Sequence, residues 1–411
     1  MTMNETGNQG DQNEHPQLSS RLLSLLSGVD QVELEHFELE IGELEFFIPI
    51  GEKTAPGVTI PLARSRPATL IHEGFTPASA QYPGKIREIT LGATNKDGGS
   101  RGSTVLIGGA SAPAFVSSDR LPPHAPVIAM DVFDMHIPLP KALKAAVADV
   151  MDNPAEWAKI NVEQFGAQMV TVHLMSTDPL IADRSPREAA ETVEEVLQAV
   201  DVPLIIGGCG HPRKDAEVFT EIAEAASGER LLLNSVTLEM AELHTLEGVA
   251  KAAQKHGHAL LAFTGLELNS AKELNRRLYE YLPPEDIVMD LTTVALGYGL
   301  EYSFTVHERA RIAALMGDTE LQHPTISAST NAWAAREAWL DLDPLFGRRE
   351  IRGPLWETLN GLTLLLAGVD LFMMMHPAAV HTMRTVSSQL MQPDGGAAGD
   401  PGDWVGVRLE E

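Results

Sequence analysis

The chain has 411 residues, of which 44% are hydrophobic and 21% are charged, as expected for a globular protein with one large domain or two smaller ones. Its formal net charge of −27 argues against a nucleic-acid partner, because phosphate contacts need clustered Lys and Arg. It has no run of about 18 apolar residues, which argues against a membrane span, and its N-terminus lacks the apolar segment of a signal peptide. We therefore expect a cytoplasmic protein without a membrane partner.

The single cysteine, Cys209, limits the redox and metal chemistry of the chain. One thiol cannot form an intramolecular disulfide, and it cannot supply the four thiolates of an iron–sulfur cluster. We therefore expect no iron–sulfur cluster in this chain. Cys209 itself is interpreted as a small loop residue, because no His–acid pair is evident beside it.

The two ends of the chain differ in composition from its centre. Residues 1–17 are rich in Asn, Gln, Glu and Gly and predict a disordered acidic tail. Residues 18–84 are expected to form an N-terminal extension and linker, in which alternating apolar residues from Val32 to Ile48 predict a β-ribbon. Residues 392–411 are rich in Gly, Pro and Asp and predict a flexible C-terminal tail.

The central residues 85–391 carry a regular pattern. Two apolar stretches, 86–91 and 103–107, flank a Gly-rich turn and predict a hairpin. After it, short apolar runs alternate with longer segments of helical period, such as 186–199, 215–227 and 243–256. The apolar runs are Val127–Met130, Met169–Leu174, Pro203–Ile206, Leu231–Leu233, Ala259–Phe263, Ile287–Leu291, Pro324–Ser327 and Leu371–Met375.

Eight buried strands that alternate with amphipathic helices over roughly 250 residues predict a TIM barrel. A doubly wound open sheet has the same local repeat and is the main alternative. The count of eight, the even spacing of the runs and the absence of a G-x-G-x-x-G turn after the first run favour the barrel. The predicted fold class is therefore α/β, a (β/α)8 barrel of residues 85–391 with an N-terminal β-rich extension.

In such a barrel, ligands bind where the strands end. No Lys ends any of the eight runs, so Schiff-base chemistry lacks a nucleophile, and no H-E-x-x-H motif or compact His and carboxylate set indicates a metal hydrolase. Hydroxyls, amides and glycines predominate instead, and they suit a polar heterocycle or an amide-rimmed ligand. The residues at these ends are Asp131, Asp134, His173, Thr177, Asp178, Gly207–Pro212, Asn234, Ser235, Thr237, Thr264, Asp290, Thr292, Thr293, Ser329, Thr330, Asn331 and His376.

Some of these residues also have purely structural interpretations. An Asp at a strand end, such as Asp131 or Asp290, more often caps a helix or accepts loop N–H bonds than binds a ligand. His173 and His376 are more often satisfied loop histidines than ligands.

Seven segments carry a resemblance to a known family. They are Asn95–Arg101, Ile107–Gly109, Asp131–Asp134, Gly207–Gly210 with Lys214 and Asp215, Leu231–Leu238, Thr292–Ser303 and Thr330–Trp339. Together they resemble the small subunits of the corrinoid iron–sulfur protein of the acetyl-CoA pathway, called delta in the archaeal acetyl-CoA decarbonylase/synthase complex. The resemblance extends from about residue 32 to residue 390, and its last two motifs are long and specific.

The resemblance implies a barrel related to pterin-binding methyltransferases and a large partner subunit that carries the iron–sulfur cluster and a corrinoid-binding domain. The corrinoid would lie between that domain and the top of this barrel, with no catalytic residue from this chain. It would take a methyl group from methyltetrahydrofolate, or a related pterin, through a separate methyltransferase, and deliver it to acetyl-CoA synthase/CO dehydrogenase. The residues expected to face the corrin are Gly208, Asn234, Thr264, Thr293, Tyr298, Thr330 and Asn331.

Three positions depart from corrinoid or family patterns. Asp134-Met-His136 begins like the D-x-H-x-x-G motif of some corrinoid proteins, but Leu139 replaces the Gly and we interpret the match as chance. Leu291 and Ala335 stand where the family often has Pro and Gly, which changes loop stiffness near the expected corrin contacts.

Two other functions remain open from the sequence. A stand-alone pterin-dependent methyltransferase could hold a pterin ring through Asp131, Asp290 and the amide of Asn234. A purely structural subunit of the same complex would need none of these side chains for ligand contacts.

Overall fold

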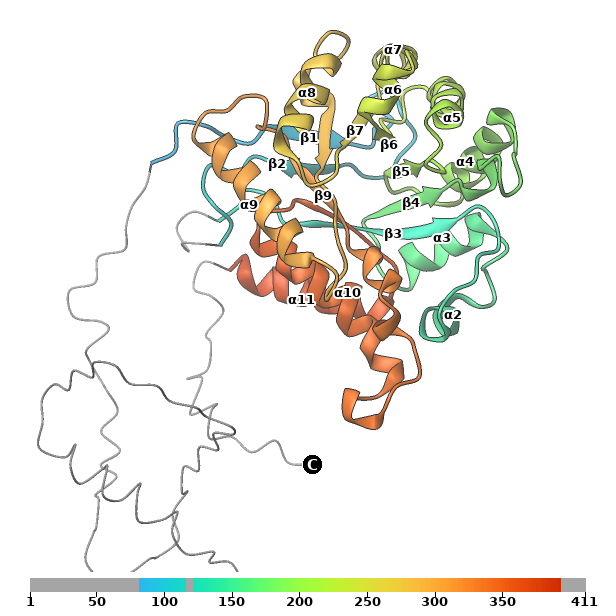
Figure 1. The fold of residues 1–411 in the computed structure, drawn as a ribbon. Helices are drawn as coiled ribbons and strands as arrows, with labels where there is room; N and C mark the ends of the chain where they lie inside the picture. Colours follow the sequence, from blue (N-terminus) through green and yellow to red (C-terminus); the bar gives the residue numbers. More distant parts are fainter. Residues whose placement is uncertain (1–80, 116–120, 393–411) are drawn as a thin grey trace, which may run out of the picture. The chain divides into compact units, whose positions relative to one another are not determined.

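The computed structural model describes residues 81–115 and 121–392 (Figure 1). In this part of the chain, eight parallel strands close into a barrel in the order β10-β3-β4-β5-β6-β7-β8-β9. Because β10 pairs with both β9 and β3, the (β/α)8 barrel is confirmed and the open sheet is excluded. The strands are β3 (Val127–Phe133), β4 (Met169–His173), β5 (Leu204–Gly207), β6 (Leu232–Val236), β7 (Ala259–Phe263), β8 (Ile287–Asp290), β9 (Thr325–Ala328) and β10 (Leu371–Met374).

The predicted acidic tail, the β-ribbon of the N-terminal extension and the predicted C-terminal tail from residue 393 onward lie outside the described residues.

Helices between the strands cover the outside of the barrel (Figure 1). Within the described ranges, none of them is long and apolar enough to cross a membrane. They are α2 (Lys141–Val147), α3 (Pro154–Glu163), α4 (Pro186–Ala199), α5 (Pro212–Ala225), α6 (Leu238–Glu242), α7 (Leu246–His256), α8 (Leu268–Leu278), α9 (Leu300–Leu315), α10 (Arg349–Leu366) and α11 (Pro377–Leu390).

Local sequence signals set the ends of several helices. At the start of α4, the hydroxyl of Ser185 accepts from the backbone N–H of Glu188, whose carboxylate accepts from the N–H of Ser185. This capping box stabilises the first turn, and Pro186 occupies the first helical position, where its missing N–H costs no hydrogen bond. At the end of α7, Gly257 adopts the left-handed conformation with φ of 80°. A side chain would be strained there, which explains why the helix ends at a glycine.

Strands β5 and β9 extend one residue beyond their predicted ends, and two others extend by three residues. β3 continues past Met130 to Phe133, and β6 continues past Leu233 to Val236. Asp131 and Asn234 therefore lie inside strands and not after them, which corrects the prediction. The parallel ladder needs only backbone groups, so a polar side chain can continue a strand where it points into the open end of the barrel.

The predicted hairpin is present as β1 (Glu88–Leu91) and β2 (Val105–Gly108), which pair antiparallel. Ile89, Leu91 and Ile107 of the hairpin are buried in one cluster with inward-facing residues from the barrel strands, such as Val127 at the start of β3. The backbone N–H of Gly92 also donates to the carbonyl of Arg230, just before β6, at 2.9 Å. The hairpin therefore closes the amino-terminal end of the barrel and leaves the opposite end free.

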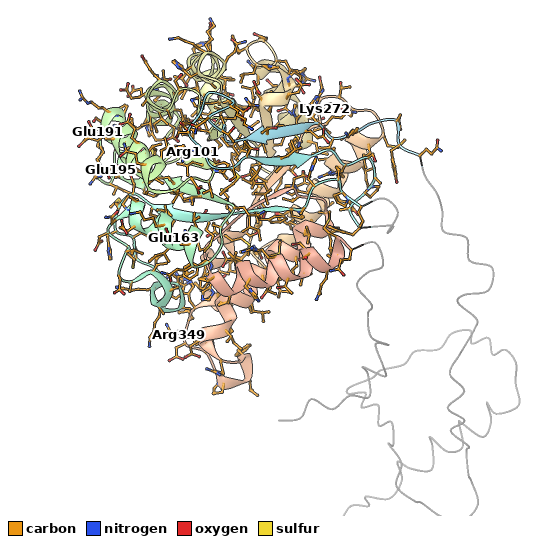
Figure 2. The ribbon with its side chains drawn as sticks, turned by 180° about the vertical axis from the view of Figure 1, so that it is seen from behind. Arg101, Glu163, Glu191, Glu195, Lys272 and Arg349 are labelled. Carbon is orange, nitrogen blue, oxygen red and sulfur yellow. The ribbon has the colours of Figure 1, made fainter. Side chains whose placement is uncertain are left out.

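Arg101, in the loop of this hairpin, fastens it to the barrel (Figure 2). Arg101 is 4% exposed, and its guanidinium donates to the carboxylate of Glu229 at 2.7 Å. It also donates to the carbonyls of Leu197 and Val200, at the end of α4. The Asn95–Arg101 segment that contributes to the family resemblance is thus a structural element at the closed end.

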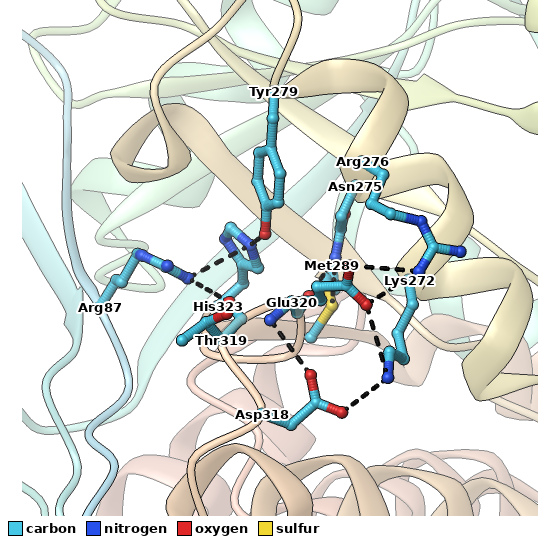
Figure 3. Close-up of polar contacts among 10 residues, drawn as sticks. All are labelled: Arg87, Lys272, Asn275, Arg276, Tyr279, Met289, Asp318, Thr319, Glu320 and His323. Atoms are coloured by element: carbon cyan, nitrogen blue, oxygen red, sulfur yellow. Dashed lines mark hydrogen bonds and ion pairs between the residues drawn. The ribbon is translucent and has the colours of Figure 1, made fainter.

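A second polar cluster joins β1 to α8 and to the loop before β9 (Figure 3). Arg87 donates to the carbonyls of Thr319 and Gln322 at 2.9 and 3.1 Å. Burial lowers the pKa of His323 to about 3, so its ring is neutral. Its Nδ1 lies 3.0 Å from the carbonyl of Ile287 and its Nε2 lies 2.6 Å from the hydroxyl of Tyr279. With both ring nitrogens paired, this cluster is structural.

Candidate functional site

A cavity of about 600 Å³ opens at the carboxyl ends of the barrel strands. Its walls include the inward-facing residues at the ends of six strands. These are His173 (β4), Asn234 (β6), Phe263 (β7), Asp290 (β8), Ala328 (β9) and Met373 (β10). The first turn of α5 and the loops after β6 and β7 complete the wall with residues such as Asp215, Thr237 and Thr264.

Two of the predicted corrin-facing residues, Asn234 and Thr264, line this cavity. The side-chain amide of Asn234 has a weak contact with the sulfur of Met373 at 3.6 Å, which leaves most of its hydrogen-bonding capacity free. The hydroxyl of Thr264 is buried and has no hydrogen-bond partner among the described residues. Both side chains are therefore available to a polar ligand.

Gly208 lies beside the cavity, and its structural role depends on its backbone and on the absence of a side chain. Its N–H donates to the carbonyl of Asn234 at 2.8 Å. A Cβ on Gly208 would lie 2.5 Å from the carboxyl group of Asp215, so glycine is required for this close approach. Asp215 in turn accepts from the N–H groups of Cys209 and Gly210 at 2.8 and 2.9 Å. The Gly-rich loop after β5 is thus held in place around a buried carboxylate.

The other four predicted residues lie in the loops after β8 and β9. Thr293 is buried and donates to the hydroxyl of Ser327 at 3.0 Å, while the side-chain amide of Asn331 donates to the carbonyl of Thr293 at 2.9 Å. The hydroxyl of Thr330 is buried without a partner in the described part of the chain. Tyr298 is 56% exposed. None of the four is a lining residue of the cavity itself.

Asp290 and Asp134 illustrate the two interpretations of a strand-end carboxylate, as a possible ligand contact and as an acceptor of loop hydrogen bonds. Asp290 lines the cavity, and burial raises its pKa to about 6, although its Oδ1 accepts a hydrogen bond from the N–H of Thr292 at 2.8 Å. Asp134 accepts hydrogen bonds from the N–H and the hydroxyl of Ser176, and it therefore anchors the loop after β4. His136, the other polar residue of the D-x-H segment, pairs on the surface with Asp152.

The thiol of Cys209 is not activated. It lies 3.1 Å from the carboxylate of Asp215, and burial raises its pKa to about 11. The thiol is therefore neutral and a poor nucleophile at neutral pH, which agrees with its interpretation as a loop residue. Within residues 81–115 and 121–392, no group of three His, Cys, Asp or Glu side chains could hold a metal ion.

Two buried polar groups were not predicted from the sequence: Asp131 was considered functionally only as a possible pterin contact, and its pairing with His173 was not predicted. Asp131 and His173 face each other at the ends of β3 and β4, with 3.4 Å between Oδ1 and Nε2. The alternation of inward and outward side chains along each strand is the signal that could have identified them, since Ala129 and Met169 belong to the inward-facing cluster.

Glu357, in the middle of α10, is the second of these groups. It is completely buried, and burial raises its pKa to about 7. Its carboxylate accepts from the indole N–H of Trp333 and from the backbone N–H groups of Met375 and His376. It therefore joins the loops after β9 and β10. A lone Glu in a helical segment gives no signal of this role.

The fold and the cavity define a (β/α)8 barrel with an open, polar cavity at the carboxyl ends of its strands. The family model described as "CO dehydrogenase/acetyl-CoA synthase delta subunit" matches residues 88–345, more than half of the chain. The chain belongs to this family.

Several curated relatives are similar over most of the chain. The "Acetyl-CoA decarbonylase/synthase complex subunit delta" of Archaeoglobus fulgidus is 50% identical over 346 residues, which cover 82% of this chain and 76% of the relative. The protein of the same name from Methanosarcina mazei is 46% identical over 396 residues, covering 94% of this chain and 90% of the relative. That of Methanothermobacter thermautotrophicus is 44% identical over 369 residues, covering 89% and 91%.

Among solved structures, the chain is similar to dihydropteroate synthases. The enzyme of Thermus thermophilus is 16% identical, with a TM-score of 0.43, and the match covers 73% of this chain and 99% of that structure. The enzyme of Yersinia pestis is 13% identical, with a TM-score of 0.45, and the match covers 64% and 93%. These similarities are too distant to support a statement on function.

Proposed function

We propose that this chain is the small subunit of a corrinoid iron–sulfur methyl carrier in a cytoplasmic acetyl-CoA decarbonylase/synthase complex. In this role it covers one face of a corrinoid that a large, cluster-bearing subunit holds from the other side. The methyl group comes from a methyltetrahydropterin through a methyltransferase and passes on to acetyl-CoA synthase/CO dehydrogenase. The names of the similar relatives support membership in such a complex.

The observation that carries this proposal is the open cavity with its hydroxyl and amide lining. A corrinoid is larger than the drug-sized ligands that a cavity of about 600 Å³ encloses, so the barrel can cover only part of it. The corrin rim carries carboxamide groups, and the unpaired hydroxyl of Thr264 and the amide of Asn234, which both line the cavity, are suitable partners for them. The donor set and the size therefore fit a shared corrinoid.

We assign the expected corrin-facing residues to two roles. Asn234, Thr264, Thr330 and the exposed Tyr298 would contact the corrin rim, and the backbone of Gly208 would permit its close approach. Thr293 donates to Ser327 and Asn331 donates to the carbonyl of Thr293, and these two residues would hold the loop that positions the contacts. A bound corrinoid would supply the cobalt that carries the methyl group, while this chain orients the corrin and excludes water from one face.

Cobalt content after purification tests this proposal. The chain expressed alone is expected to carry little cobalt, and the chain co-expressed with the large subunit is expected to carry one corrinoid per complex. Stoichiometric corrinoid on the isolated chain would contradict the shared site. A cobalt-free complex prepared with ample cobamide would contradict the corrinoid role altogether.

A stand-alone pterin-dependent methyltransferase is the second candidate, and one observation favours it. Asp290 and Asn234 line the same cavity, and the pKa of Asp290 is raised to about 6, so its carboxyl group can both donate to and accept from a pterin ring near neutral pH. Titration calorimetry of the isolated chain with methyltetrahydrofolate tests this function. Heat of binding at micromolar ligand would favour it, and no heat at millimolar ligand would end it.

A purely structural subunit is the third candidate. The substitutions Asn234→Ala and Thr330→Ala separate it from the first, because a structural role requires only assembly. If either variant assembles normally but slows methyl transfer, the structural interpretation fails.

A further inference from the structure

Asp131 and His173 form a buried pair beneath the cavity, and the contacts proposed above leave this pair unused. Asp131 is 1% exposed, and neither of its carboxylate oxygens has a hydrogen-bond partner among the described residues. The Nε2 atom of His173, 3.4 Å from Oδ1, is also buried and unpaired there. Thr171 lies opposite Asp131 in the β3–β4 ladder, and its buried hydroxyl also has no hydrogen-bond partner among the described residues.

Unpaired polar groups are costly in a protein interior, and most buried ones are hydrogen-bonded. Several such atoms on two adjacent strands, one of them on His173 in the cavity wall, therefore indicate a functional group of residues. Core packing alone would be served better by apolar side chains at these positions.

The environment of His173 determines which of its nitrogens is presented to a ligand. Oδ1 of Asp131 lies 3.4 Å from Nε2 without a hydrogen bond in the described structure, but a carboxylate can only accept, so its charge favours the proton of a neutral imidazole on Nε2. An acid in this position fixes the tautomer of a histidine and makes its other nitrogen a better acceptor. The lone pair then resides on Nδ1.

Two neighbours hold the imidazole in this orientation. Phe133 stacks on it, with 5.0 Å between the ring centroids and an interplanar angle of 22°. Gly207 leaves room on the other side, where an added Cβ would lie only 2.8 Å from Nδ1. His173 is a lining residue of the cavity, and its side chain is 18% exposed although Nε2 is buried. The Nδ1 edge therefore borders the space that a ligand would occupy.

We propose that Nδ1 of His173 accepts a hydrogen bond from an amide-type N–H of the ligand bound in the cavity, with Asp131 and Gly207 as positioning residues. The proposal rests on the proposed function for the presence of a ligand, and it adds a recognition group to that site. A carboxamide of the corrin rim and the lactam N–H of a pterin share this chemistry.

Three substitutions test different parts of the proposal. His173→Phe keeps a stacked ring but removes the acceptor. Asp131→Asn can donate to Nε2, which favours the opposite tautomer and turns Nδ1 into a donor. Gly207→Ala introduces a Cβ that displaces the imidazole without changing its chemistry. His136→Phe is the matched control, because His136 forms a similar pair with Asp152 at 2.8 Å on the exposed surface.

Binding is measured with two probes. One is hydroxocobalamin added to the corrinoid-free complex with the large subunit, and the other is tetrahydrofolate added to the isolated full-length chain. We expect each of the three variants to bind one probe about tenfold more weakly than wild type, and His136→Phe to bind it normally. The probe whose binding is weakened identifies whether the corrin or the pterin supplies the N–H that His173 accepts. Because Asp131 acts through His173, adding Asp131→Asn to His173→Phe should cause no further loss.

Wild-type affinity in every variant, for every probe that the wild type binds, would overturn the proposal and leave the proposed function intact. A wild type that binds neither probe would contradict the proposed function. In that case, imidazole ¹⁵N spectra still test whether Asp131 sets the tautomer of His173. We expect the proton on Nε2 of His173 in the wild type, a changed signal in Asp131→Asn and an unchanged one in Asp152→Asn. A proton on Nδ1 in the wild type would overturn the proposal as well.

Discussion

The indole N–H of Trp333 donates a 3.0 Å hydrogen bond to the buried carboxylate of Glu357, and this contact joins the loop after β9 to the middle of α10. The same carboxylate accepts from the backbone N–H groups of Met375 and His376 in the loop after β10. One side chain therefore determines the relative position of two loops at the open end of the barrel. The family motif Thr330–Trp339 includes this tryptophan, so part of the motif serves loop placement.

Glu357→Gln should weaken this junction. The amide NH2 would replace one acceptor oxygen and face an N–H donor, leaving at least one buried donor unpaired. We expect the free energy of unfolding to fall by about 2 kcal/mol and the amides of Met375 and His376 to exchange faster with deuterium. Urea unfolding and hydrogen exchange measure the two effects. The control Glu350→Gln, on the exposed start of the same helix, should change neither, and equal exchange in both variants would contradict the assignment.

Asp290 should make the protein less stable as the pH rises from about 4 to about 6. Burial raises its pKa from 3.8 to about 6, so the folded state holds this proton more tightly than the unfolded state does. Its contribution to stability is therefore complete below about pH 4 and is lost as the pH rises through about 6.

Asp290→Asn removes this proton and should flatten the pH dependence. Between about pH 5 and about pH 7.5, the wild type should lose about 1 kcal/mol more of its unfolding free energy than Asp290→Asn does. Urea unfolding of both proteins at the two pH values measures the difference. Glu357 titrates in the same range in both proteins and cancels from the comparison. Identical losses would mean that Asp290 keeps a nearly normal pKa.

Much of the barrel could be predicted because its signals are local. The run Ala259–Phe263 and the helix Pro186–Ala199 were predicted with the bounds that the structure has, since apolar period, proline and capping residues all agree there. The end of β3 was missed because Asp131 looks like a loop residue until its inward direction is known. Residues such as Asn234 and Thr264 could be assigned to the open end from their strand positions alone.

The missed features of the site depend on contacts between distant segments. Glu357 contacts Trp333 and His376 only after three elements have packed together, and no local sequence pattern predicts these contacts. His173 was interpreted as a satisfied loop histidine. The structure instead leaves its Nε2 unpaired next to Asp131, because the pairing register of β3 and β4, and not either sequence alone, brings the two side chains together.

Arg101 should contribute to stability but not to ligand binding. It is buried at the closed end of the barrel and pairs with two carbonyls and with Glu229, whose side chain is 14% exposed, so Arg101→Met leaves a largely buried carboxylate without its partner. We expect a loss of about 3–5 kcal/mol in unfolding free energy, with normal cobalt content in the complex that still assembles. Arg187→Met is the control, because Arg187 and Glu191 form an exposed pair on α4 and should contribute little. Loss of cobalt from folded Arg101→Met complex would contradict this separation of the two ends.

Two glycine substitutions in helices should have opposite effects, since only one of the glycines has a neighbour. In α7, a Cβ at Gly248 would meet nothing within 4 Å, so Gly248→Ala should stabilise the protein by up to about 1 kcal/mol through better helix propensity. In α10, a Cβ at Gly353 would lie 2.2 Å from the ring of Trp333. Gly353→Ala should therefore be destabilising by about 1–3 kcal/mol and should loosen the Trp333–Glu357 contact. Thermal unfolding ranks the two variants and the wild type by stability. Tryptophan fluorescence is expected to shift only in Gly353→Ala. Equal stability of the two variants would mean that the loop after β9 can move away from α10 at no cost, and that Glu357 does not fix it.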